Sequence, residues 1–429
     1  MAESGLSSVC LHSYLNDMAE LVVSASDGSC KLTNLPTELI HTIFENINNE
    51  RDLVNLMVTC KTLTQPAEEA LWRICNTKGY IKLSNMTVEK RDRLLNWIQK
   101  LTLRLEDEGM QPTGLTMRPP RLQELVIEHH STAPLNSPVN ISSFVTNSLR
   151  RLDIRNGVTD NFIPALSSIT GLKHLFIAAE VEVRDGDARQ LLRVLKTMPQ
   201  LVSLFAGSLS SIGLFLEAAN HKVITDFSVI VHVEHDTVMR VIQLPNAFVG
   251  LRRLCLWTSS SAVCQILPKL TSLEKLQLNV SPVLLPGETL ASAAANLFRA
   301  IGAMNKLTLL LVLLRGFHVP LPDKMFQPLA NLPHLEKLTI HADLQPTAQL
   351  SEVDEFLPLH PSCSLKHLHV RLGQGLPADW IQDLAKNHPN LETLILGRFV
   401  KFNELSITFP ALKEMTFVDP EVSYCRTNM

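Results

Sequence analysis

Apolar residues repeat in a short pattern along most of the chain, from about residue 90 to residue 418. Each unit has apolar side chains at its first, fourth and sixth positions, as in Leu122, Leu125 and Ile127. Because successive side chains of a strand face opposite ways, the fourth and sixth positions predict a short strand with one buried face. Thirteen units begin, 21 to 34 residues apart, at Ile98, Leu122, Leu149, Leu172, Leu201, Ile224, Leu251, Leu273, Leu307, Leu335, Leu365, Leu391 and Leu412.

Several segments between these strands predict helices. Residues 187–198, 289–304 and 378–388 carry apolar side chains three and four positions apart, which is typical of an amphipathic helix. Strands that alternate with returning helices at this period predict a solenoid, with a parallel sheet on its concave face and helices on its convex face. The third, fifth and seventh positions of each unit should then line the concave face.

Residues 35–72 have a different pattern, which predicts three short helices. The first carries apolar side chains at three- and four-residue steps, at Leu39, Ile40, Ile43, Phe44 and Ile47. The second begins at Asp52 and continues this spacing through Leu53, Leu56, Met57 and Cys60, and Pro66 opens the third. A unit of this size rarely buries so much apolar surface by itself. We therefore expect a partner.

The same residues resemble the F-box family. The resemblance is carried by Leu35-Pro36, Glu38, Ile43-Phe44, Asp52-Leu53, Val58-Thr59-Cys60-Lys61 and Leu71-Trp72, with Leu63 where an aromatic residue is usual. It implies docking to the Skp-family adaptor of an SCF-type ubiquitin ligase. The adaptor-binding residues expected from it are Leu35, Pro36, Ile40, Ile43, Leu53, Leu56, Cys60 and Leu63. The alternative is that these helices only cap the first repeat of the solenoid.

The repeating part resembles leucine-rich-repeat proteins over residues of about 90 to 418, although the Asn expected eight residues after each first Leu is missing. The predicted fold class is α/β: a three-helix F-box followed by a leucine-rich-repeat solenoid. The expected division is an N-terminal tail at 1–31, the F-box at 32–80, about thirteen irregular repeats at 81–418 and a C-terminal tail at 419–429.

Composition narrows the functional classes. Eight cysteines without a CxxC pair are typical of a reducing compartment. The chain contains no apolar run of 18 residues and no secretory start, so we expect no membrane span and a location in the cytoplasm, the nucleus or both. A formal net charge of −3 argues against general nucleic-acid binding. We expect no cofactor.

Candidate substrate contacts lie at the concave positions of the middle repeats. Phe176, Phe205 and Trp257 are large apolar side chains at such positions, and clustered exposed aromatics often mark binding hot spots. The alternative is that these side chains are covered as ordinary core. For Leu309, Leu311 and Leu313 we favour coverage, because a continuously apolar strand is usually buried on both faces.

A second candidate contact is cationic. The tenth and eleventh units place Lys337, His341, His367, His369 and Arg371 at concave positions. Such a group can receive an acidic or phosphorylated segment. We favour the alternative, in which these side chains are separately solvated and bind no partner. His367 and His369 also have the spacing of metal ligands, but the sequence supplies no third ligand, so we predict no metal site.

Catalytic motifs are sparse. The chain has no GxSxG, HExxH or P-loop motif, and Gly373-Gln374-Gly375 lacks the third glycine of a dinucleotide site. Residues 232–235, His-Val-Glu-His, form the only compact acid and imidazole group, which we interpret as a solvated loop. We predict no catalytic residue.

The sequence therefore favours a non-catalytic substrate-recognition subunit of a ubiquitin ligase. The F-box would bind the adaptor, through it a cullin and a RING protein, and the repeats would hold a protein substrate. The alternative is an interaction scaffold or an inhibitor that binds its target without ubiquitylation.

Overall fold

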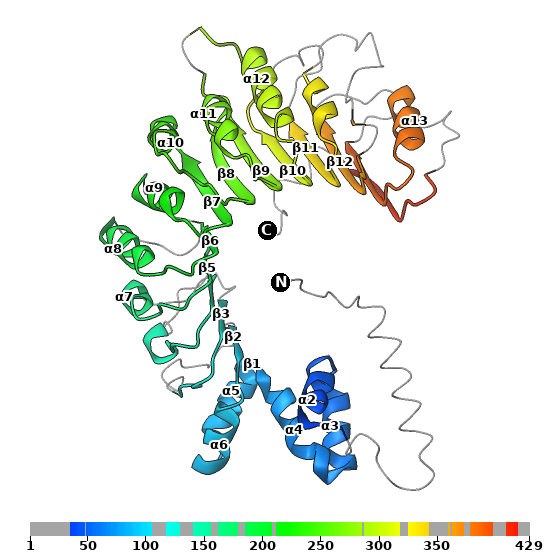
Figure 1. The fold of residues 1–429 in the computed structure, drawn as a ribbon. Helices are drawn as coiled ribbons and strands as arrows, with labels where there is room; N and C mark the ends of the chain where they lie inside the picture. The colour runs from blue at the N-terminus through cyan, green and yellow to red at the C-terminus, as the bar shows by residue number, and fades with distance from the viewer. Residues whose placement is uncertain are drawn as a thin grey trace. The chain divides into compact units, whose positions relative to one another are not determined.

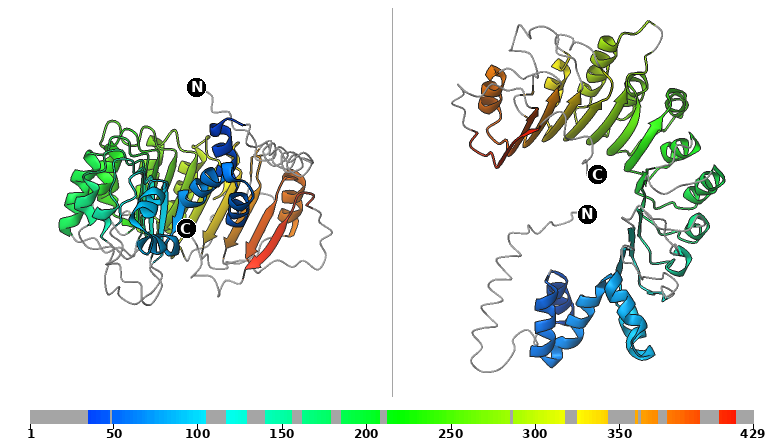
Figure 2. Two further views of the ribbon diagram at one scale, coloured as in Figure 1. Left: turned by 90° about the horizontal axis from the view of Figure 1, so that it is seen from below. Right: turned by 180° about the vertical axis from the view of Figure 1, so that it is seen from behind.

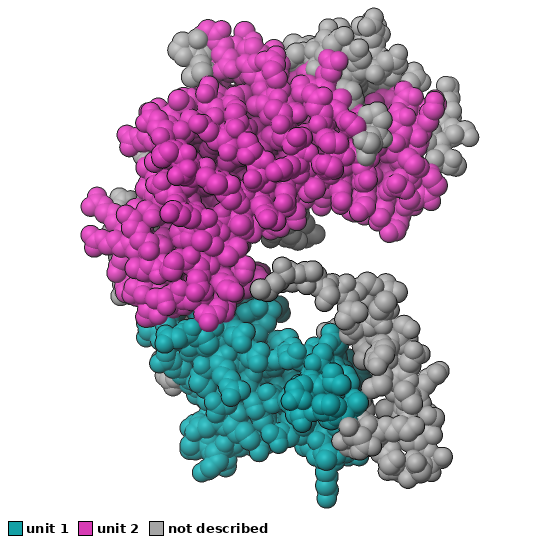
Figure 3. All heavy atoms as spheres, viewed as in Figure 1, with its two compact units in different colours: residues 1–149 teal, residues 150–429 magenta. Residues whose placement is uncertain are grey.

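The computed structural model describes residues 35–47, 49–104, 117–128, 140–155, 162–178, 185–207, 212–284, 287–317, 325–342, 359–360, 363–372, 378–397 and 409–418. The side chains of residues 185–188, 212, 378–379 and 417–418 are excluded from the description. The predicted tails at 1–31 and 419–429 and the Gly373-Gln374-Gly375 segment lie outside the described residues. The chain divides into two compact units, unit 1 at residues 1–149 and unit 2 at residues 150–429 (Figure 3). The boundary predicted near residue 80 does not separate these units.

Unit 1 begins with three helices, α2 (Thr37–Glu45), α3 (Glu50–Thr59) and α4 (Lys61–Arg73). Helix α2 starts directly after Pro36 and has Glu38 in its first turn, where a carboxylate favours the positive end of the helix dipole. Helix α3 is capped by Asn49, whose side chain accepts the Arg51 N–H at 3.1 Å. The third helix begins at Lys61, five residues before the predicted start, and contains Pro66 within its length.

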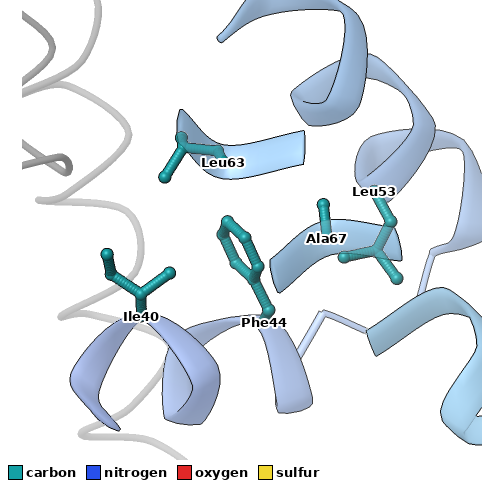
Figure 4. Close-up of a cluster of buried hydrophobic side chains, with 5 residues drawn as sticks. All are labelled: Ile40, Phe44, Leu53, Leu63 and Ala67. Carbon is teal, nitrogen blue, oxygen red and sulfur yellow. The ribbon is translucent and has the colours of Figure 1, made fainter. Parts of the chain in front are cut away.

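These three helices share a small apolar core, formed by Ile40, Phe44, Leu53, Leu63 and Ala67. Figure 4 shows the Phe44 ring directed from α2 toward the α4 residues Leu63 and Ala67. Phe44 is only 1% exposed. Its ring is therefore the largest side chain that holds the three helices together.

The rest of unit 1 starts the sheet. It contains β1 (Ile74–Asn76), α5 (Thr77–Ser84), α6 (Val88–Leu95), β2 (Lys100–Arg104), β3 (Glu124–Glu128) and a 3-10 turn, η3 (Ile141–Ser143). Strand β1 pairs in parallel with β2, and β2 with β3. The 1-4-6 pattern did not predict β1, which lies within the residues assigned to the F-box.

Unit 2 continues with strands and helices in alternation. Its strands are β4 (Arg151–Ile154), β5 (His174–Ile177), β6 (Ser203–Ala206), β7 (Asp226–Val233), β8 (Arg253–Ser259), β9 (Lys275–Ser281), β10 (Leu309–Leu314), β11 (Lys337–Ala342), β12 (His367–Leu372), β13 (Thr393–Gly397) and β14 (Glu414–Val418). Its helices are α7 (Phe162–Leu166), α8 (Asp185–Lys196), α9 (Ile212–Asn220), α10 (His235–Ile242), α11 (Ser260–Ile266), α12 (Leu290–Gly302) and α13 (Ala378–Asn387), with 3-10 turns η4 (Leu267–Lys269) and η5 (Gln327–Asn331).

Each strand of unit 2 pairs in parallel with the next one in the chain, from β4 to β14. Figures 1 and 2 show helices α7 to α13 on one side of these strands. The opposite face of the sheet is called the concave face below. The predicted α/β solenoid is therefore confirmed, and the helices predicted at 187–198, 289–304 and 378–388 appear as α8, α12 and α13.

The apolar positions of the repeat pattern form the core. In the first twelve units all residues at the first, fourth and sixth positions are buried, as the pattern predicts. In the thirteenth unit Met415 is 38% exposed. The ladder is also irregular at β7, whose register with β8 shifts between Ser228 and His232. Such a bulge bends the strand and redirects the side chains that follow it.

Candidate interaction surfaces

The helices α2 and α3 expose apolar side chains to solvent. Leu39 is 50% exposed, Val54 46% and Val58 78%. Val54 and Val58 are one helical turn apart, so they lie on the same face of α3. Both valines leave apolar surface in water, and fully burying a wholly exposed side chain of this kind contributes about 1.5–3 kcal/mol, which is the upper limit for each.

The structure separates the predicted adaptor-binding residues into two groups. Ile40, Leu53 and Leu63 are buried in the helical core, which corrects their assignment as surface contacts. Leu35, Ile43, Leu56 and Cys60 are partly buried against that core, and Pro36 is exposed. Leu39, Val54 and Val58 were not among the predicted adaptor-binding residues, because the helical spacing does not show which apolar side chains face inward.

The concave face of the first strands is charged but internally paired. In unit 1 Lys100 and Glu124 form an ion pair at 3.3 Å, and Arg104 and Glu128 form another at 3.1 Å. In unit 2 Arg155 Nε lies 3.4 Å from Asp153 Oδ1 on β4. These strands therefore neutralise most of their own charge.

The three predicted aromatic contacts form two separate clusters. Phe176 and Phe205 stack on each other with ring centroids 4.0 Å apart and planes 11° apart. Trp257 instead forms a T-shaped contact with the His232 ring, at a centroid distance of 5.9 Å, and the Arg315 guanidinium lies 5.7 Å from the centroid of the Trp257 ring. All three aromatic side chains are partly exposed. These side chains are therefore neither fully buried nor part of one continuous aromatic surface.

Strand β10 is covered on one face only. Leu310, Val312 and Leu314 are buried, whereas Leu309, Leu311 and Leu313 are partly exposed. The prediction that both faces of this strand are buried is therefore wrong. Three leucine side chains at the concave positions of β10 are therefore partly accessible to solvent.

The predicted cationic residues meet on two neighbouring strands. In the register of β11 and β12, Lys337 is opposite His367 and His341 is opposite Arg371. His341 Nε2 approaches the ring nitrogens of His369 at 3.0 and 3.2 Å. His369 therefore contacts His341 rather than His367, the residue whose spacing from it had suggested a pair of metal ligands. Within the described ranges, no group of three or more His, Cys, Asp or Glu side chains is arranged to hold a metal ion.

His369 is held in its neutral form. Burial, as the largest cause, and the positive charges of His341, Arg371 and Lys337 together lower its pKa to about 3. We expect its Hε1 NMR resonance to stay constant from about pH 8 to about pH 5, whereas the urea-unfolded chain should titrate near pH 6.5. A folded-state midpoint near 6.5, assigned through the His369→Asn variant, would contradict this.

The same shift has a consequence for stability. Because the folded-state pKa lies below the unfolded value, the unfolded chain takes up the proton first as the pH falls below about 6.5. The His369 contribution to stability is thus complete above about pH 6.5 and is lost as the pH falls toward 3. At neutral pH His369 therefore adds no positive charge to this surface.

Two further imidazoles, on β7 and α10, lie within hydrogen-bond distance of serine hydroxyls. His232 Nε2 is 3.0 Å from the Ser281 hydroxyl, and His235 Nδ1 is 3.3 Å from the Ser261 hydroxyl. The interpretation of residues 232–235 as a solvated loop is wrong, since His232 belongs to β7 and His235 to α10.

One thiol and imidazole pair was not predicted. Cys363 Sγ lies 3.8 Å from His388 Nδ1, and both residues are buried. Burial raises the pKa of the Cys363 thiol and lowers the pKa of His388. Both shifts favour the neutral forms, which is the opposite of an activated thiolate and imidazolium pair.

Comparison with known proteins addresses the N-terminal helices. Residues 32–76 match the F-box-like family model, so the F-box prediction is confirmed for that segment, about a tenth of the chain. No curated protein matches the sequence. In the described part of the chain, no helix has both the length and the apolar composition needed to cross a membrane.

Two solved structures are similar in fold. The Rad7 and Elc1 complex in yeast aligns at 16% identity and a TM-score of 0.48, covering 96% of this chain and 98% of that one. The TLR13–ssRNA13 complex aligns at 15% identity and a TM-score of 0.42, covering 77% of this chain and 51% of that one.

Proposed function

We propose that this chain, with its F-box-like segment at residues 32–76, is a substrate-recognition subunit of an SCF-type ubiquitin ligase. The F-box-like helices bind a Skp-family adaptor, and through it the chain joins a cullin and a RING protein. The solenoid of unit 2 holds the substrate. The chain contributes proximity rather than a reacting side chain.

The observation that carries the proposal is the exposed apolar surface of α2 and α3. Leu39, Val54 and Val58 are left in water by the fold, within a segment that matches a family of adaptor-binding modules. Their full burial by a partner would supply several kcal/mol before the costs of association. A helical cap on the first repeat would explain the buried core residues but not these exposed ones.

We expect the double variant Val54→Glu, Val58→Glu to lose at least about tenfold in affinity for the adaptor, because the adaptor would then cover two carboxylates without partners in place of two valines. The measurement is co-purification and titration of the full-length chain with a recombinant Skp-family adaptor. Val88→Glu is the matched control, since Val88 is an exposed valine on α6, outside the matched segment.

The outcomes separate the two interpretations of these helices. Adaptor binding that is lost in the double variant and kept in Val88→Glu supports the receptor. If the folded wild-type chain binds no adaptor, these helices only cap the first repeat of the solenoid. That result would remove the basis of the proposed function.

The alternative function is a scaffold or inhibitor that binds its target without ubiquitylation. Target turnover in cells distinguishes it, because turnover should stop in Val54→Glu, Val58→Glu if the chain is a ligase receptor. An inhibitor would still bind and block its target. This variant is preferable to deleting residues 32–80, since that deletion would also remove strand β1 and half of α5.

A further inference from the structure

The concave face of β8 to β12 carries cations and no carboxylate. The charged side chains at its concave positions, together with Arg315 directly after β10, are Arg253, Lys275, Arg315, Lys337 and Arg371. The chain as a whole has 42 acidic and 39 basic residues, so a surface without acids on five neighbouring strands is a local departure from the composition. We call these five residues the cationic face.

Several of these cations are not neutralised locally. Arg253 pairs with Asp226 of β7 at 3.4 Å. Among the residues that the structure describes, Lys275, Arg315 and Lys337 form no ion pair with a carboxylate. This differs from β2, β3 and β4, where arginine and lysine side chains pair with carboxylates on the same or the next strand. Unpaired cations on a common face attract acidic partners.

A strip of partly exposed leucines crosses the cationic face. By register, Leu309 of β10 lies between Lys275 of β9 and Lys337 of β11. Leu311 and Leu313 follow it at alternate positions of the same strand and are partly exposed like it. Apolar side chains framed by cations fit a partner that presents both apolar and acidic groups.

Two buried polar atoms lie beside this strip. Trp257 Nε1 and Asn279 Oδ1 are both buried and have no hydrogen-bond partner among the described residues. Trp257 and Asn279 are opposite each other in the register of β8 and β9. An unsatisfied buried polar group costs about 1–3 kcal/mol, so this part of the concave face carries two uncompensated polar atoms beside the leucine strip.

We propose that the cationic face and the Leu309, Leu311 and Leu313 strip dock an acidic, apolar-anchored segment of a partner protein. The partner's carboxylates pair with Lys275, Arg315 and Lys337, and its apolar side chains cover the leucines. This deepens the proposed function, on which it rests for the assumption that unit 2 holds the substrate. A nucleic acid matches the face less well, because its phosphates leave the leucine strip uncovered.

The test uses the full-length chain and a fluorescein-labelled peptide of repeated Glu-Glu-Leu-Leu, which presents both glutamate and leucine on each side of an extended segment. About eight residues suffice to span five strands, roughly 20 Å. We expect fluorescence anisotropy to show salt-sensitive binding that weakens at least about tenfold in Lys275→Glu, Lys337→Glu. The control Lys222→Glu, Lys306→Glu makes the same charge change at exposed lysines in turns and should bind like the wild type.

Further probes identify the groups that matter. Leu309→Ala, Leu313→Ala should also weaken binding, and it leaves the inward leucines of β10 in place. A peptide in which glutamine replaces glutamate should bind at least about tenfold more weakly. A peptide in which phosphoserine replaces glutamate tests whether phosphoryl groups serve as the anions.

The proposal is overturned if the glutamine peptide binds as tightly as the glutamate peptide, or if Lys275→Glu, Lys337→Glu leaves binding unchanged. Tighter binding of a single-stranded RNA of equal charge would assign the face to nucleic acid, and a wild-type dimer that blocks the peptide would assign it to a second copy. Adaptor binding is measured on the same samples. Peptide binding without adaptor binding would refute the ligase role but keep the docking face.

Discussion

Replacing Phe44 by alanine is expected to unfold the three N-terminal helices while leaving unit 2 folded. Phe44 is the largest side chain of their shared core and is 1% exposed. Truncating a buried phenylalanine costs about 3–5 kcal/mol, which is about the whole stability that a core of this size supplies. Adaptor binding should disappear together with the fold of these helices.

Hydrogen exchange resolves this effect by segment. In Phe44→Ala we expect amide protection to be lost in residues 37–73 and kept in the strands of unit 2, because repeat units depend mainly on their immediate neighbours. Val58→Ala is the control, since Val58 is 78% exposed and its truncation leaves no cavity. Unchanged protection in Phe44→Ala, or equal loss in both variants, would refute the role assigned to this core.

Replacing Gly302 by alanine is expected to destabilise unit 2 by about 2 kcal/mol. Gly302 is the last residue of α12 and is buried against η5. A Cβ at this position would lie 2.6 Å from Cβ of Pro328 and 2.8 Å from its carbonyl carbon, distances that force one of the two turns to move. The helix propensity gained by alanine, about 1 kcal/mol, offsets only part of this cost.

Urea unfolding followed by circular dichroism measures the difference. The matched variant is Gly250→Ala, because a Cβ at Gly250 would meet only the Lys222 carbonyl oxygen, at 3.9 Å. Its midpoint should stay near that of the wild type. If the two variants unfold at the same urea concentration, the close packing of α12 on η5 does not limit the stability of unit 2.

The repeat pattern predicted the sheet well for a physical reason. Positions 1, 4 and 6 must be apolar in every unit because each strand is buried on its helix-facing side, so the signal recurs thirteen times and matches β2 to β14. Strand β1 was not predicted because it has only three residues and directly follows a helix. Near Ser228 the pattern holds, but it gives no sign of the bulge in β7.

The candidate surfaces were harder to predict than the fold. In short helices rich in apolar residues, spacing alone does not tell Ile40, which is buried, from Leu39, which is exposed. The contact between His341 and His369 joins residues 28 positions apart, and it depends on the register between repeats of unequal length. The leucines of β10 were assigned to the core because an apolar run carries no information on which side lacks a covering layer.

The junction between α4 and β1 bears on how force would pass through unit 1. Arg73 ends the helix, pairs with Glu45 at the end of α2, and offers its carbonyl to the Gln99 N–H at 3.0 Å, while Ile74 already belongs to the strand. No residue is left over to serve as a flexible joint. A force or torque applied to helices α2 to α4 should therefore be transmitted to the first strand of the sheet rather than be absorbed in a linker.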